Sequence, residues 1–197
     1  MRVALCSLII VLSLAMYASD SGLLRKRDRI GCLPCDAALH TGDIMLLGSD
    51  TWRGRLLLAL DDDSEYVHIG LVEVCSNKVF LIHADPAQGG VVRDALRDYL
   101  KANDAERIKV LRVKTDRDTV NAAMIFARRQ WIEKKTFDNS FRYRKGKGFY
   151  CTEIVLRAYD SAGIKLLPDV KDGDRIFPSE VIKSGCVSKI AEWGRPK

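Results

Sequence analysis

The chain has 197 residues, of which 47% are hydrophobic and 29% are charged, and its formal net charge is +6. This length and composition are those of an ordinary globular protein, so we expect one domain with its own core. Basic residues are not interleaved with aromatic ones, and we therefore expect no nucleic-acid partner.

The N-terminus has the pattern of a secretory signal peptide, predicted over residues 1–18. Met1 and Arg2 precede an apolar stretch from Val3 to Ala18, and small or polar residues follow. A basic cluster over residues 25–29 favours an uncleaved membrane anchor instead, although the apolar stretch is short for a span. We expect an exported protein, periplasmic or secreted, with anchoring as the alternative. Residues 19–40 are a predicted linker and residues 41–197 the folded domain.

The chain contains six cysteines, and loss of Cys6 with the signal peptide would leave an odd number. At least one thiol then stays free. If that thiol is Cys151, the other four could form two disulfides in any of three pairings. These four are Cys32, Cys35, Cys75 and Cys186. The close spacing of the first two is also compatible with a redox motif or half a zinc site, but no second pair follows.

In chain order, the first predicted element of the domain is a buried strand over residues 44–48, an apolar run introduced by turn residues. Residues 52–60 are predicted to form a short helix. The acidic segment over residues 61–65 lacks the Gly and Glu of a calcium loop and is interpreted as a solvated loop.

Two strand-like runs, over residues 67–74 and 79–84, predict a hairpin that carries His68 on one strand and His83 on the other. A turn of two or four residues would place both histidines on one face as opposite or diagonal neighbours. A three-residue turn would place them on opposite faces.

Farther along, we expect a helix over residues 93–102, a strand over 107–113 and a helix over 118–135 with Asp118 or Thr119 as its cap. Small and apolar residues then repeat at helical spacing from Cys151, and Gly163 stands where a helix commonly ends. The C-terminal residues around Pro178 and Trp193 show no strong pattern.

Cys151 is the candidate nucleophile, because the positive end of a helix stabilises a thiolate and lowers the pKa of the thiol. Thiol catalysis also needs an imidazole and a group that orients it, and His68 and His83 are the candidates for these roles. Backbone N–H groups at the start of the helix, including that of Thr152, and the hydroxyl of Tyr66 would stabilise the oxyanion. A zinc site formed by the two histidines and the cysteine is the alternative.

Five short strings carry a family resemblance when they are taken in order. They are Thr41-Gly42-Asp43-Ile44, residues 64–70, residues 80–84 with 90–92, residues 137–141, and Tyr150-Cys151-Thr152-Glu153. This order resembles the YaeF/YiiX-type permuted papain-like amidases of the NlpC-type cysteine hydrolases. Phe177-Pro178-Ser179-Glu180 is similar to the segment that follows the nucleophile helix in that family.

The resemblance implies an α+β, circularly permuted papain-like fold, with an antiparallel sheet packed against helices and the nucleophile at a helix N-terminus. Cys151 matches the family's nucleophile and His68 its histidine. Many members have a glutamate at the position of His83, and the histidine is similar to the lecithin retinol acyltransferase group. Glu153 matches the family's Cys-Ser-Glu string and is expected to support the first helical turn rather than to take part in catalysis.

The expected activity is therefore that of a cysteine hydrolase that cleaves an amide through an acyl-thioester on Cys151, with no cofactor. The resemblance suggests a cell-wall peptide or an N-acyl or lipid amide as the substrate, with contact to the cell wall or a membrane surface. Basic residues at positions 142, 144, 145 and 147 are solvated or attract an anionic substrate. A lipid acyltransferase or thioesterase and a non-catalytic papain-like binding module are the alternatives.

Overall fold

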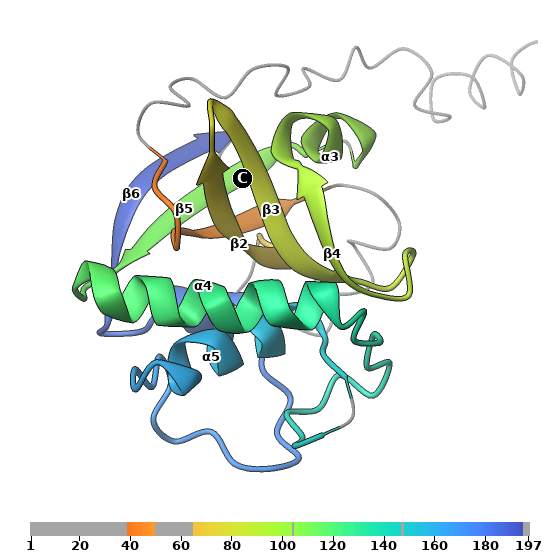
Figure 1. Ribbon diagram of the computed structural model, residues 1–197, viewed down its shortest axis with the longest axis vertical. Helices are drawn as coiled ribbons and strands as arrows, with labels where there is room; N and C mark the ends of the chain where they lie inside the picture. The colour runs from red at the N-terminus through yellow and green to blue at the C-terminus, as the bar shows by residue number, and fades with distance from the viewer. Residues whose placement is uncertain (1–38, 50–64, 104, 147, 195–197) are drawn as a thin grey trace, which may run out of the picture.

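A computed structural model of the protein describes residues 39–49, 65–103, 105–146 and 148–194. These residues form a six-stranded sheet with the order β4-β3-β2-β1-β5-β6, in which each strand is antiparallel to its neighbours (Figure 1). The strands are β1 (Ile44–Gly48), β2 (His68–Cys75), β3 (Lys78–Asp85), β4 (Gly90–Ala95), β5 (Arg107–Val113) and β6 (Val187–Gly194). The helices are α3 (Leu96–Ala102), α4 (Arg117–Ile132), α5 (Cys151–Ser161) and α6 (Pro178–Ile182).

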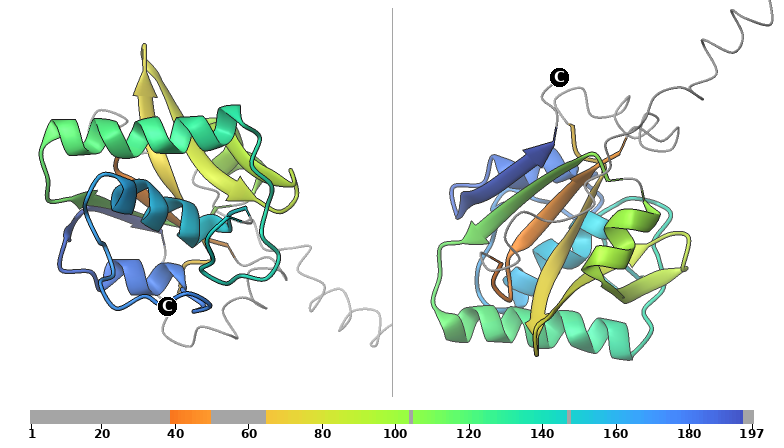
Figure 2. Two further views of the ribbon diagram at one scale, coloured as in Figure 1. Left: turned by 60° about the horizontal axis from the view of Figure 1, so that its bottom comes forward. Right: turned by 90° about the horizontal axis from the view of Figure 1, so that it is seen from above.

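The sheet is covered on both faces. Helices α4 and α5 lie side by side and pack with one face of the sheet into the larger core cluster (Figure 2). Leu96 and Leu100 of α3 belong to a second cluster with residues of the other face. The antiparallel sheet packed against helices is the expected α+β architecture.

Strand β1 shows how the sequence specifies this arrangement. Ile44 and Leu46 face the cluster of α4 and α5, whereas Met45 and Leu47 face the cluster of α3. Because both faces are covered, the strand is a continuous apolar run rather than an alternating one. The predicted buried strand over these residues is confirmed.

The predicted long helix is α4, but its cap is Asp116 and neither Asp118 nor Thr119. The Asp116 carboxylate accepts a hydrogen bond from the Thr119 backbone N–H at 2.8 Å, which satisfies one of the unpaired donors of the first turn. Ala123, Met124 and Ala127 are buried on the inner face of the helix, so the helical spacing of these residues reflects core packing.

Two expectations from the sequence are corrected. The helix expected over residues 93–102 begins only at Leu96, because Arg93–Ala95 complete β4 by pairing with β3. The C-terminal region, which shows no strong pattern, contains α6 and the edge strand β6. Its strand residues are mostly exposed and pair only with β5, so they lack an apolar signature.

Several expectations lie outside the described residues. They are the signal peptide or anchor, nearly all of the linker, the helix over residues 52–60 and most of the acidic loop. Among the residues that the structure describes, no helix is both long and apolar enough to cross a membrane.

Candidate active site

Cys151 is the first residue of α5, directly after the N-cap residue Tyr150. The residue is buried, with 8% of its surface exposed. The helix ends at Ser161, and Gly163 follows with a φ of 86° that favours glycine. The predicted position of the thiol at the start of a helix that ends near Gly163 is confirmed.

The two candidate histidines lie on one face of a hairpin. Strands β2 and β3 are joined by a two-residue turn, Ser76–Asn77, and Cys75 pairs with Lys78. In this register His68 and His83 are diagonal neighbours, as expected for a two-residue turn. His68 Nε2 lies 2.9 Å from His83 Nδ1, and the two rings are nearly perpendicular. The two side chains therefore share a hydrogen bond.

The sheet opens between β2 and β3 at the histidines. Pairing of these strands begins at Leu71 and Ile82, so the first residues of β2 pair only with β1 and the last residues of β3 only with β4. The backbone N–H of Ile69, next to His68, is consequently available and forms a hydrogen bond to the Cys151 thiol. The gap in the pairing is thus where α5 brings the thiol to the strand that carries His68.

Gly70 lies close beside His83, directly before the paired part of β2 begins. A Cβ at this position would lie 2.9 Å from the Cβ of His83 and 2.9 Å from Leu81 side-chain atoms. Any larger residue would displace the His83 strand. The absence of a side chain at position 70 therefore allows the close approach of the two histidines.

Asp94, which no sequence pattern singled out, adds a carboxylate next to the pair of His68 and His83. His83 is fully buried, and its Nε2 lies 3.2 Å from Oδ2 of Asp94 on β4. Gln88 Nε2 donates to the same carboxylate oxygen at 2.7 Å. Pairing of Leu81 with Asp94 makes His83 and Asp94 diagonal neighbours on one face. The sequence would have pointed to Asp94 as a neighbour of His83 only if residues 93–95 had been predicted as a strand.

Tyr99 of α3 packs against both imidazoles. Its ring centroid lies 4.5 Å from that of His83 and 5.8 Å from that of His68. Burial raises the pKa of the Tyr99 hydroxyl, and the charges of Asp85 and Cys151 raise it further. Tyr99 therefore stays neutral and covers part of both rings, while His68 remains partly exposed.

The pKa shifts at the site differ from the sequence expectation. Burial raises the pKa of the Cys151 thiol above its ordinary value of 9.0, and hydrogen bonds from Thr152 and the Ile69 backbone only partly oppose this effect. Burial, followed by the charge of His83, holds the pKa of His68 well below 6.5. The expected lowering of the thiol pKa is thus outweighed by desolvation, and the resting pair is a neutral thiol and a neutral imidazole.

The two predicted oxyanion groups have different surroundings. Thr152 is buried in the first turn of α5, and its backbone N–H stabilises the thiolate form of Cys151. Its hydroxyl oxygen has no hydrogen-bond partner among the described residues. The Tyr66 hydroxyl donates to Glu192 Oε1 at 2.8 Å. Its single proton is therefore engaged with β6, so a role of Tyr66 at the oxyanion requires that this bond be exchanged.

Glu153 connects α5 to the preceding basic loop. Its buried Oε1 accepts hydrogen bonds from the Arg144 backbone N–H at 3.1 Å and from the Arg157 guanidinium at 3.3 Å. Burial raises its pKa to about 7, although these partners act in the opposite direction. Arg142 from the same loop donates to the Gly173 carbonyl at 2.8 Å, so part of the basic segment has a structural role.

The remaining described cysteines do not form disulfides. Cys75 at the hairpin turn is exposed, Cys186 is partly buried, and both are free thiols. The two disulfides that the sequence allowed among the four cysteines are therefore not formed, because each pairing would use both Cys75 and Cys186. Cys32 and Cys35 lie outside the described residues. Within the described ranges, no group of three or more His, Cys, Asp or Glu residues could hold a metal ion.

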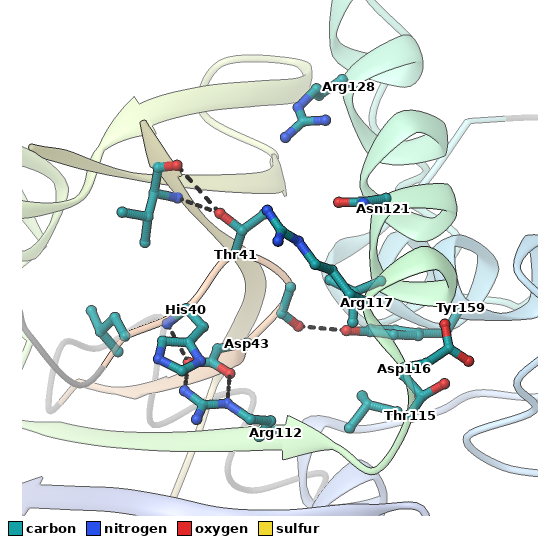
Figure 3. A pocket seen from close by; sticks show the side chains of 15 residues that line it. His40, Thr41, Asp43, Arg112, Thr115, Asp116, Arg117, Asn121, Arg128 and Tyr159 are labelled. Carbon is teal, nitrogen blue, oxygen red and sulfur yellow. Dashed lines mark hydrogen bonds and ion pairs between the residues drawn. The ribbon is translucent and has the colours of Figure 1, made fainter. Parts of the chain in front are cut away.

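A separate polar cavity of about 660 Å³ lies at the other end of β2, where the strand passes Val74 (Figure 3). The buried Asp43 carboxylate accepts two hydrogen bonds from Arg112, at 2.7 and 2.8 Å. The Tyr159 hydroxyl donates to the Gly42 carbonyl at 2.5 Å. No predicted site residue lines this cavity. These bonds connect the residues directly before β1 to β5 and α5.

Comparisons with known proteins give the family of the chain and a solved structure with a similar fold. A search of curated proteins finds no match. A solved structure of yiiX from Escherichia coli O157:H7, described as a metalloprotein, is similar to the chain with a TM-score of 0.66 and 19% sequence identity. The similarity covers 79% of this chain and 98% of that one. The family model of permuted papain-like amidase enzymes matches residues 38–179. The chain belongs to this YaeF/YiiX, C92 family and is a thiol-dependent hydrolase of the amidase type.

Proposed function

We propose that the protein cleaves an amide of a peptide or lipid through an acyl-thioester on Cys151. The observation that carries the proposal is the hydrogen bond of 2.9 Å between His68 and His83, next to the strand residue whose N–H contacts the Cys151 thiol. A nucleophile, a base and a group that orients the base are the components that thiol catalysis requires.

The first step is a proton transfer within the resting neutral pair. His68 Nε2 is bonded to His83, so His68 Nδ1 is the ring nitrogen that can accept the proton from Cys151 Sγ. The resulting thiolate attacks the carbonyl carbon, and the carbonyl oxygen becomes an oxyanion. The Thr152 backbone N–H and its neighbours in the first turn of α5 stabilise this charge.

The tetrahedral intermediate then collapses. The electron pair returns from the oxyanion, the C–N bond breaks, and the amine leaves with the proton from His68 Nδ1. Water then gives a proton to the same nitrogen and attacks the acyl carbon of the thioester. The C–S bond breaks, the carboxylic acid is released, and Cys151 Sγ recovers its proton.

We propose cell-wall peptides and N-acyl or lipid amides as the substrate classes, which is the range suggested by the family resemblance. The family match to amidase enzymes supports catalysis over a non-catalytic binding module. Acyl transfer to an alcohol or amine is the second candidate. The histidine at position 83 favours acyl transfer, because the order His68, His83, Cys151 is similar to that of the lecithin retinol acyltransferase group.

A resident metal does not fit the arrangement of the two imidazoles. Zinc bound tetrahedrally by two histidines holds their nitrogens about 3.3 Å apart, with both lone pairs directed at the metal. Here His68 Nε2 and His83 Nδ1 are 2.9 Å apart, at hydrogen-bond distance from each other. We therefore assign no step to a metal, although the similar yiiX protein is described as a metalloprotein.

The proposal is tested by incubating the purified protein with peptide amides and with N-acyl amides of several chain lengths. Cys151→Ala is expected to abolish product formation, and Cys151 is expected to carry the acyl group in quenched reactions analysed by mass spectrometry. Cys75→Ala and Cys186→Ala are the matched controls and should retain activity, since both are free thiols that have no hydrogen bond to His68, His83 or Asp94. Turnover that survives in Cys151→Ala would contradict the proposal, and an added alcohol or amine distinguishes transfer from hydrolysis.

We also propose that the protein acts outside the cytoplasm, at the cell wall or a membrane surface. The support is the signal-like sequence over residues 1–18 and the basic cluster that follows it. Fractionation of cells that produce the full chain, compared with a chain lacking residues 1–18, tests this proposal. Recovery of both proteins in the cytoplasmic fraction would contradict it.

A further inference from the structure

A continuous row of hydrogen bonds leads from His68 to the protein surface. His68 Nε2 is 2.9 Å from His83 Nδ1, and His83 Nε2 is 3.2 Å from Asp94 Oδ2. His83 is fully buried, whereas the Asp94 side chain is 27% exposed. Gln88 donates to the same Asp94 oxygen at 2.7 Å. The row therefore ends in a carboxylate held by two donors.

The carboxylate determines the direction of every hydrogen bond in this row. An ionised carboxylate only accepts, so His83 Nε2 must carry a hydrogen, and in the neutral form of His83 the lone pair then lies on Nδ1. His68 Nε2 must then donate to His83 Nδ1, which leaves the lone pair of His68 on Nδ1. This is the tautomer that a base for Cys151 requires.

We propose that Asp94 is a positioning residue of the active site, which acts through His83 to hold His68 in its basic tautomer and to offset the positive charge formed on His68. This role rests on the proposed function, since it concerns the base of the same reaction. The imidazole of His83 cannot supply a negative charge. Asp94 supplies a negative charge one side chain farther from the thiol.

Other titratable groups around the imidazole pair do not replace this carboxylate. Tyr99 of α3 packs on both rings and stays neutral. Asp85, at the end of β3, accepts hydrogen bonds from the Ala87 backbone and from Gln88. Cys151 approaches from α5. Asp94 is the carboxylate hydrogen-bonded to either histidine among the described residues, and its pKa is lowered chiefly by that bond to His83.

The test is the pH dependence of Cys151 alkylation, followed by peptide mapping in a Cys75→Ala/Cys186→Ala background. This measurement reports activation of the thiol without any substrate. Asp94→Asn keeps the shape of the side chain and removes its charge. We expect its alkylation at pH 7 to be about tenfold slower, which corresponds to a rise of about one pKa unit in the profile. Asp98→Asn, an exposed carboxylate on α3, is the matched control and should behave as the wild type.

A second pair of variants tests whether Asp94 acts through position 83. His83→Glu provides a carboxylate that can contact His68 directly, so Asp94→Asn should change alkylation less than twofold in the His83→Glu protein. If Asp94→Asn still slows alkylation tenfold in the His83→Glu protein, Asp94 does not act through position 83 and the proposal is overturned. The ¹⁵N NMR spectrum of the wild-type histidines provides a check that needs no variant. A protonated Nδ1 on neutral His68 would also overturn the inference.

The outcomes distinguish this inference from the proposed function. If the wild type and His68→Ala are alkylated equally, Cys151 is not activated by His68, and both proposals fail. If alkylation depends on His68 but is unchanged in Asp94→Asn, only the role of Asp94 fails.

Discussion

Glu153 is a buried carboxyl group whose ionisation opposes folding. It lies in the first turn of α5 and is fully inaccessible to solvent. Its Oε1 has hydrogen-bond partners, but its Oε2 has none among the described residues. Burial therefore outweighs the Arg157 guanidinium and raises the pKa of the carboxyl from 4.5 to about 7.

The perturbation is Glu153→Gln, which keeps the size of the side chain and removes its ionisation. A raised pKa in the folded state means that the stabilising contribution of Glu153 is complete below pH 4.5 and is lost as the pH rises to about 7. The loss corresponds to about 3 kcal/mol of unfolding free energy. The variant should thus be near the wild type in stability at pH 4.5 and more stable than it by up to that amount at pH 8.

The assay is urea denaturation followed by circular dichroism at several pH values between 4.5 and 8. The difference between variant and wild type is the informative quantity, because the contributions of His68 and the other titrating groups cancel in it. Asp160→Asn, an exposed position on the same helix, should show a difference that does not vary with pH. A constant difference for Glu153→Gln across this range would refute the reasoning.

Two further predictions concern the Asp43–Arg112 ion pair and the spacing of the two histidines. Asp43→Ala leaves Arg112 without its carboxylate and should lower the unfolding free energy by about 2–3 kcal/mol, less than for a fully buried pair because Arg112 is one-third exposed; equal urea midpoints for variant and wild type would contradict this. Gly70→Ala introduces a Cβ 2.9 Å from His83 and should slow Cys151 alkylation at least tenfold by separating the histidines. Unchanged alkylation in a folded Gly70→Ala protein would show that the close approach is not required.

Local patterns predicted much of the fold. The apolar run at Ile44–Gly48, the hairpin that carries His68 and His83, and the helix that begins at Cys151 were all evident, because each one follows from periodicity and turn residues. Strand β6 was not evident. An edge strand that pairs with β5 and exposes most of its residues has no apolar pattern to detect.

The sequence by itself determined the nature of the site: a cysteine at a helix start, two histidines on the strands of one hairpin, and the strings that identify the family. These features depend on residue type and on short-range spacing. Only the tertiary structure decided the contact of Asp94 with His83 and the direction in which the thiol pKa is shifted. Asp94 reaches His83 through pairing of β3 with β4, and the thiol pKa rises because α5 is buried against the sheet. Strand pairing and desolvation depend on segments distant in the chain, so no local pattern encodes them.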